Sequence, residues 1–396
     1  MQLKPVSAKS TVDWLIDGAR DKPLPQDVLT ELCERLSASG IPLWRAVVFV
    51  RTLHPQVAGR RFVWTPDKGT VVSEGTFQLL ERDIFRTSPM AEVSKTGQPL
   101  RRRLADPECP MDYSILPDLR KEGITDYLVL PLSFTSGEIH FASWATRQPG
   151  GFTDAEIAVL ESVVAPLARV AEIRAARRVA GNLLSTYVGQ NAGERVLAGQ
   201  IRRGFTEQIH AAIWLSDMRG FTKLADRLAP QALVDLLNRY FDCQVPPIAD
   251  HGGEVLKFMG DGLLAIFPIG AGADAAAVCD AALKAAHEAR AKVAALQATA
   301  DDAEAVRFGL ALHVGDILYG NIGSGNRLDF TCIGPAVNLA ARLEKLAGRL
   351  GRTILASQEF ARHRRGEFVP IGNFAVAGFA EEQMVFGLSD EGKQTQ

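Results

Sequence analysis

Two aspartates, Asp217 and Asp261, stand beside glycines in short turns, each next to an apolar run rich in β-forming residues. Asp217 follows residues 211–215. Asp261 lies in a Met-Gly-Asp-Gly turn between residues 254–258 and 263–267, which predicts a tight hairpin. Either aspartate alone is explained by the frequency of Asp in turns. Together they favour a site for two Mg²⁺ or Mn²⁺ ions bridged by the phosphates of a triphosphate.

A phosphate-binding turn is expected directly after Asp217. The apolar spacing over residues 224–240 predicts that a helix follows the turn. Free N–H groups and the positive end of the helix dipole gather at such a position, and Gly220 lets the backbone approach phosphate oxygens closely. The residues expected to contact the substrate are Met218, Arg219, Gly220, Phe221 and Thr222.

A third motif, LDFTCIGPAVNLAARLE, occupies residues 328–344. Together with the Asp217 turn and the KFMGDG segment at residues 257–262, it resembles the class III nucleotidyl cyclase catalytic domain, over roughly residues 204–387. The resemblance implies two-metal catalysis at Asp217 and Asp261. In this family the metals lower the pKa of the ribose 3'-hydroxyl for attack on the α-phosphate and neutralise the leaving pyrophosphate.

The purine pocket implied by the resemblance contains Lys257, which would donate to adenine N1, and Thr331, whose hydroxyl would accept from the 6-amino group. Guanine would leave these groups mismatched, so ATP is the expected substrate. A one-residue slip would place Cys332 there, as in guanylate-specific relatives, and guanylate cyclase therefore remains an alternative. The anchors Gly334 and Asn338 favour Thr331.

Asn338 and Arg342 are four residues apart on a predicted helix and share one face. By resemblance, Asn338 orients the ribose and Arg342 stabilises charge developing on the α-phosphate. Residues 375–380 lack the lysine that relatives place on the triphosphate, which also leaves open a nucleotide-binding module without turnover. The candidate substitutes for that lysine are Arg362, Arg364 and Arg365.

The composition is that of a globular protein with more than one core: 396 residues, 47% hydrophobic and 23% charged. A net charge of −2 gives no overall attraction to nucleic acid or acidic membranes. Five scattered cysteines fit reduced intracellular thiols. With no signal-peptide or membrane-span pattern, the expectation is a soluble cytoplasmic protein.

The first domain is expected over residues 1–152. A helix at 28–37, strands at 45–51 and 61–65, a mixed segment to Arg103 and a hairpin at 126–145 resemble, in their order, a GAF-type sensor domain. No ligand motif appears there, so a small-molecule regulator is a hypothesis without a named ligand. Bicarbonate is a second hypothesis, which rests on Thr331 alone.

A helical linker is expected over residues 153–203. Thr153 and Glu156 form a capping box, and apolar residues at three- and four-residue spacing follow from Ile157 to Ala171, as in a dimerising helix. The alternative is one amphipathic helix that packs on its own domain. Pro166 is expected to bend or restart the helix. Turn residues at 189–193 should close the linker.

The catalytic domain is expected over residues 204–390, as a ferredoxin-like α+β fold. After the hairpin come an alanine-rich helix at 271–296, a polar break at 299–304, a strand at 306–314 and a glycine-rich connection to Gly325. The resemblance further implies a homodimer, in which one chain supplies the aspartates of a site and its partner supplies Lys257, Thr331, Asn338 and Arg342.

Overall fold

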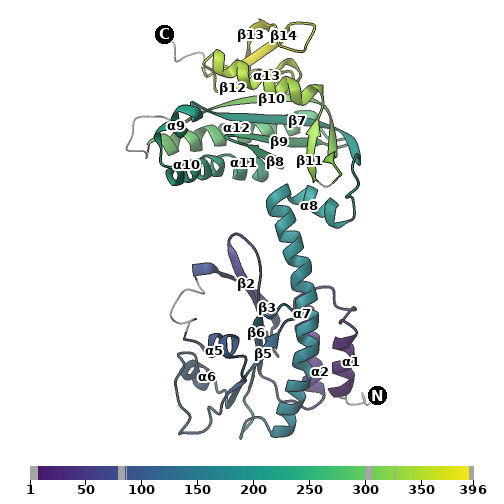
Figure 1. The fold of residues 1–396 in the computed structure, drawn as a ribbon, viewed down its shortest axis with the longest axis vertical. Helices are drawn as coiled ribbons and strands as arrows, with labels where there is room; N and C mark the ends of the chain where they lie inside the picture. Colours follow the sequence, from purple (N-terminus) through teal and green to yellow (C-terminus); the bar gives the residue numbers. More distant parts are fainter. Residues whose placement is uncertain (1–7, 79–84, 86, 299–305, 326, 392–396) are drawn as a thin grey trace. The chain divides into compact units, whose positions relative to one another are not determined.

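The computed structural model describes residues 8–78, 85, 87–298, 306–325 and 327–391. The chain divides into two compact units, Met1–Leu183 and Leu184–Gln396, and each combines an antiparallel-rich sheet with helices (Figure 1). The predicted polar break at residues 299–304 lies outside the described residues. Among the described helices, none is both long and apolar enough to cross a lipid bilayer.

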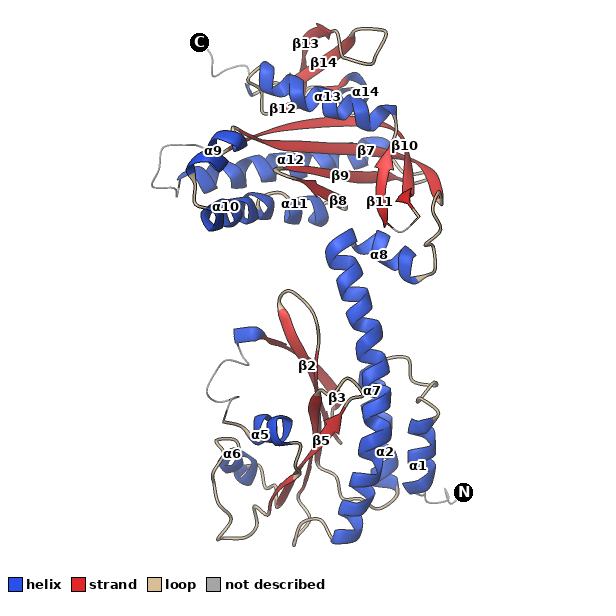
Figure 2. Cartoon of the chain, in the orientation of Figure 1, coloured by secondary structure: helices blue, strands red, loops and turns tan. Residues whose placement is uncertain are grey.

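The N-terminal unit is built on a six-stranded sheet with the order β3-β2-β1-β6-β5-β4. Helices α1, α2 and α7 cover one face, and α5 and α6 lie on the other (Figure 2). Strand β1 has the predicted bounds, whereas α1 and β3 were not predicted. The elements are α1 (Ala8–Ile16), α2 (Pro25–Ala38), β1 (Arg45–Arg51), β2 (Val57–Thr65), β3 (Gly69–Thr76), α5 (Pro89–Thr96), β4 (Leu100–Arg102), α6 (Leu116–Lys121), β5 (Asp126–Ser133), β6 (Ile139–Thr146) and α7 (Asp154–Val188).

Helix α7 begins with the predicted capping box. The Glu156 N–H donates to Thr153 Oγ1 at 3.3 Å, and the Thr153 N–H donates to Glu156 Oε2 at 2.7 Å. The helix runs unbroken through Pro166 for 35 residues, so the expected restart is wrong. Gly189, with φ 90°, ends it. A second helix, α8 (Gln190–Leu197), follows where a turn was predicted, because its apolar side buries Ala192.

The C-terminal unit contains an eight-stranded sheet with the path β13-β14-β12-β10-β7-β9-β8, and β11 pairs with β10. The central order β10-β7-β9-β8 is that of a split βαβ, ferredoxin-like sheet, as predicted. The strands are β7 (Thr206–Arg219), β8 (Glu254–Met259), β9 (Gly262–Ile269), β10 (Arg307–Ser324), β11 (Arg327–Ile333), β12 (Ile354–Ser357), β13 (Phe368–Phe374) and β14 (Gln383–Leu388).

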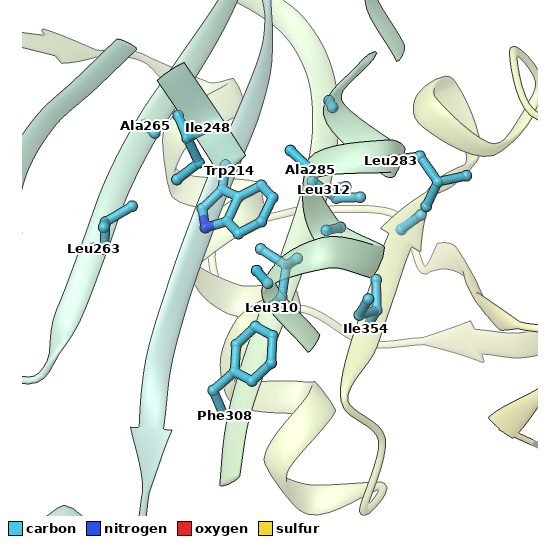
Figure 3. Packing of buried hydrophobic residues seen from close by; sticks show 14 of the residues in the cluster. Trp214, Ile248, Leu263, Ala265, Leu283, Ala285, Phe308, Leu310, Leu312 and Ile354 are labelled. Atoms are coloured by element: carbon cyan, nitrogen blue, oxygen red, sulfur yellow. The ribbon is translucent and has the colours of Figure 1, made fainter. Parts of the chain in front are cut away.

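Helices cover both faces of this sheet. The main core lies between the sheet and helices α10, α11 and α12, where Trp214 packs among apolar side chains such as Leu312 and Phe308 (Figure 3). Helix α13 packs on the opposite face through Leu339 and Leu343. The helices are α9 (Phe221–Arg227), α10 (Pro230–Asp242), α11 (Val245–Asp250), α12 (Ala275–Ala298), α13 (Pro335–Arg349) and α14 (Gln358–Ala361).

Strands β7 and β10 are both longer than predicted. Their ladder extends from the Arg307–Arg219 pair to the Gly320–Thr206 pair, so β10 continues through the expected glycine-rich connection. A Cβ on Gly320 would lie 2.2 Å from the carbonyl oxygen of Phe205. Glycine there permits close backbone approach inside a strand instead of ending it.

Candidate active site

Asp217 lies within strand β7, opposite Gly309 of β10, and not in the turn where it was predicted. Asp261 occupies the predicted tight turn between β8 and β9. A Cβ on Gly262 would lie 3.3 Å from Asp217 Oδ1, so the start of β9 packs directly against Asp217. Because β7 and β9 are neighbouring strands, the sheet brings the two predicted metal ligands together.

The two carboxyl groups interact strongly. Burial raises the pKa of Asp217 to about 7, and a hydrogen bond and charge repulsion from Asp261 act in the same direction. Glu344 adds further negative charge and Arg219 opposes the shift. Glu344 is itself 3% exposed, and burial raises its pKa. Three acids therefore surround one guanidinium, an arrangement that fits a bound cation.

A metal ion at this position would be incompletely coordinated by protein. The described residues contain no group of three or more His, Cys, Asp or Glu side chains placed to hold a metal. Asp217 and Asp261 would therefore share each ion with oxygen ligands from phosphate or water, the usual coordination of Mg²⁺ at triphosphates.

Arg219, expected to contact substrate, is engaged inside the protein. Its Nη1 lies 3.0 Å from Glu344 Oε1, and its Nη2 donates to the Glu344 carbonyl oxygen at 3.1 Å. A Cβ on Gly309 would stand 1.6 Å from Arg219 Nη2, and one on Gly348 would stand 2.5 Å from Nη1. Two glycines thus make room for the guanidinium, which anchors Glu344 beside Asp217.

The remaining turn residues divide between core and surface. Met218 is 4% exposed and packs in the main core. Gly220 adopts the left-handed conformation, φ 77°, at the start of α9, which glycine tolerates best. Phe221 begins that helix and Thr222 is exposed. The predicted turn shortens to Gly220 because β7 pairs with β10 as far as Arg219.

A cleft of about 370 Å³ opens beside Asp217. It unites three residues from distant parts of the sequence, each predicted as part of the site. Arg342, by contrast, is exposed and does not contribute to the cleft. The predicted residues in the lining are Asp217, Lys257 and Asn338, together with Cys332, which was the alternative to Thr331. Glu344 and Lys345 also line it and were not assigned to the site from the sequence.

Lys257 Nζ donates to Asp329 Oδ2 at 2.9 Å. Alternation along β11 places Thr331 on the face of Asp329, and Cys332 on the opposite face, which lines the cleft. Thr331 is 5% exposed, and its Oγ1 has no hydrogen-bond partner among the described residues. Burial raises the pKa of Cys332 to about 11, so its thiol is neutral near pH 7.

Residues 206–388 match the family described as the adenylate and guanylate cyclase catalytic domain. This match has the same extent as the sheet that carries Asp217 and the cleft. Residues 206–388 are therefore similar to a nucleotide cyclase catalytic domain. The match starts at the first residue of β7 and ends at the last residue of β14, and residues 1–205 lie outside it.

Named relatives of the cyclase domain include adenylate cyclases. The terminal-differentiation specific adenylate cyclase of Dictyostelium discoideum is 33% identical over 37% of this chain and 7% of its own length. The adenylate cyclase of Anabaena cylindrica is 30% identical over 38% of this chain and 30% of its own length. The chain thus spans less than a third of either relative.

Among solved structures, the adenylyl cyclase CyaB from P. aeruginosa is similar to the same part of the protein. It is 29% identical, and the likeness covers 46% of this chain and 95% of that one, with a TM-score of 0.42.

Proposed function

We propose that the protein is an adenylate cyclase, which converts ATP to 3',5'-cyclic AMP and pyrophosphate. One observation carries the proposal: the cleft that brings Asp217, with its pKa raised to about 7, together with Lys257 and Asn338. A half-buried acid with a raised pKa beside a second acid favours a bound cation, and a lysine and an amide at the same cleft suit a base and a ribose.

The residues in this cleft and beside it have distinct roles in the proposed reaction. Asp217 and Asp261 hold two Mg²⁺ or Mn²⁺ ions, which activate the ribose 3'-hydroxyl and neutralise the pyrophosphate when bound. Asn338, exposed at the start of α13, orients the ribose. Arg342, one turn further along α13, stabilises the charge that develops on the α-phosphate.

Lys257 and Thr331 select the purine. The Asp329 carboxylate holds Lys257 Nζ, which orients the ammonium to donate to adenine N1. The Thr331 hydroxyl, on the same face of β11 as Asp329, lacks a partner among the described residues. A buried hydroxyl left in this way costs free energy, and accepting a hydrogen bond from the 6-amino group of adenine would recover it.

A homodimer would complete the site. Two features of the described chain support this: Arg342 lies outside the cleft, and apolar side chains of β8 and β11 are exposed, among them Phe258 at 52% and Ile333 at 46%. The expected test is complementation. Chains with Asp217→Ala and Lys257→Ala, each inactive alone, should regain up to about a quarter of wild-type activity when mixed. No recovery after demonstrated subunit exchange would contradict the shared site.

Guanylate cyclase is the second candidate, and one observation favours it: Cys332, not Thr331, lines the cleft. The deciding experiment is mass-spectrometric analysis of products formed from equal ATP and GTP with Mn²⁺, beside Asp217→Ala. Cyclic AMP from the wild type alone supports the proposal, and cyclic GMP replaces it with the second candidate. Tight nucleotide binding without either product would indicate a nucleotide-binding module.

Regulation belongs to the same proposal. The N-terminal unit is proposed to act as a GAF-like sensor. The apolar residues of α7 from Ile157 to Ala171 pack in the core of their own unit, so the part of α7 proposed to dimerise is the later one, where Ile173, Leu183 and Tyr187 are exposed. Bicarbonate stimulation would act through the site that contains Thr331. A flat response to bicarbonate at fixed pH would remove that part.

A further inference from the structure

The N-terminal unit contains a cavity of about 340 Å³ on the face of its sheet that carries α5 and α6. The register of the paired strands determines which residues form the floor of this cavity. Ser73, Arg61, Phe49 and Phe141 stand directly opposite one another across β3, β2, β1 and β6. Because side chains of opposed residues project to the same face of a sheet, they form one row with a polar and an aromatic end.

The aromatic end is flat. Phe49 and Phe141 stack with ring centroids 5.6 Å apart and an interplanar angle of 10°. Tyr127, 4% exposed, forms another wall, and its hydroxyl donates to the sulfur of Met90 at 3.4 Å. Close-packed interiors rarely leave a void of this size, whereas small-molecule sites commonly have such volumes and apolar linings.

The polar end carries an available cation. Arg61 is exposed, and its Nε donates to the neutral Ser73 Oγ at 3.3 Å. Within the described part of the chain, no carboxylate forms an ion pair with Arg61. Glu74, which also lines the cavity, is neutralised by Arg60, whose Nη2 lies 2.6 Å from its Oε1. A guanidinium without a carboxylate partner can donate hydrogen bonds to the carboxylate of a ligand.

Two further polar groups border the cavity. Arg45 makes only a long contact, its Nη1 lying 3.8 Å from Glu122 Oε2. Ser143, 3% exposed, lies in the floor opposite Val47, two residues along β1 from Phe49. Among the described lining residues two are arginines and one is an acid, Glu74, which Arg60 already pairs, so the balance of charge over these residues is positive.

We propose that this cavity binds a flat aromatic carboxylate. The ring system packs against Phe49 and Phe141, and the carboxylate accepts a bidentate pair of hydrogen bonds from Arg61. Arginine suits this task because its planar guanidinium matches the carboxylate geometry. Binding at this site is independent of the cyclase chemistry, so the proposal stands or falls separately from the proposed function.

The test is isothermal titration of the full chain with naphthalene-2-carboxylate, without nucleotide. We expect saturable binding of one molecule per chain. Arg61→Gln should weaken it about tenfold, while the neutral naphthalene-2-carboxamide should bind the wild type and Arg61→Gln equally. Arg35→Gln is the control arginine, because Arg35 lies in α2, is paired with Glu31 and does not line this cavity.

A cavity-filling variant, Ser143→Leu, provides a second measurement, with its fold checked by circular dichroism. It should abolish binding of both naphthalene compounds, and if it does not fold, the Arg61→Gln series decides alone. The proposal is overturned by any of three results: no saturable binding to the wild type, binding that Arg61→Gln leaves unchanged, or equal weakening of acid and amide. Equal loss in Arg35→Gln would also overturn it.

Discussion

Each unit contains an aspartate in a sheet strand, and the surroundings of the two aspartates are opposite in kind: Asp126 is buried and Asp217 is half-buried. Asp126, at the start of β5, is fully buried. It accepts from Arg101 Nη2 at 2.6 Å, from Arg101 Nε at 3.1 Å and from the Phe152 N–H at 2.9 Å. Asp217, in β7, has the acids Asp261 and Glu344 as its neighbours instead.

This difference in surroundings indicates that the Asp126 carboxylate has a structural role and the Asp217 carboxylate a functional one. Donors within the fold satisfy Asp126, so its charge needs nothing from outside. Asp217 is placed where burial and other acids disfavour its charge, and only Arg219 opposes them. An added cation would stabilise the charged form of such a site. Four experiments break or sharpen this comparison.

Asp217→Ala should have the largest effect on activity. Removing a carboxylate that holds the catalytic ions should reduce cyclic AMP formation on the order of 10³-fold or more. Activity is measured by mass spectrometry of the product at saturating Mn²⁺ and ATP. Asp226→Ala, an exposed acid on the nearby helix α9, is the control and should keep wild-type activity. Retained activity in Asp217→Ala would refute the metal role.

Asp126→Ala should have the largest effect on stability. It leaves the Arg101 guanidinium and the Phe152 N–H without their acceptor, and breaking a buried pair in this way costs about 3–5 kcal/mol of unfolding free energy. Chemical denaturation followed by circular dichroism measures this. Asp118→Ala, which removes the exposed ion pair with Lys121, should change stability by less than about 1 kcal/mol. Similar losses in both variants would contradict the contrast.

His313 is a buried titratable group away from the two aspartates. It tests separately how burial shifts a pKa and changes stability. It is 5% exposed, its Nδ1 lies 2.8 Å from Ser357 Oγ, and burial lowers its pKa to about 4. The unfolded chain, with a histidine pKa near 6.5, binds the proton first, so stability falls as pH drops from about 6.5 to 4. The loss should approach 3 kcal/mol. His313→Gln should flatten that part of the stability curve, and an unchanged curve would contradict the assignment.

Asp217→Asn should have the smallest effect and the opposite pH trend. The raised pKa means that the folded protein, without metal, holds a proton that the unfolded chain has lost. Stability from this group therefore falls as pH rises from about 4 to 7. The amide removes this cost and should stabilise the metal-free protein by about 1 kcal/mol at pH 7.5, after allowance for solvent screening. Destabilisation by Asp217→Asn would place Asp217 with Asp126 as a structural acid.

The sequence by itself determined features that depend on neighbouring residues. The capping box of Thr153 and Glu156 and the hairpin around Asp261 formed as predicted, because each is encoded within a few residues. The ferredoxin-like strand order followed from the alternation of β-rich and helical patterns. The cyclase motifs likewise identified the domain in residues 206–388.

The tertiary structure decided what depends on distant strands. Pairing with β10 makes Asp217 part of strand β7. Gly309 and Gly348, remote in sequence, leave space for the Arg219 side chain beside Glu344. Thr331 and Cys332 lie on opposite faces of β11. Burial and the neighbouring acids raise the pKa of Asp217. Local propensity could not specify these outcomes, since register, burial and charge neighbours arise only when strands far apart in the chain pair.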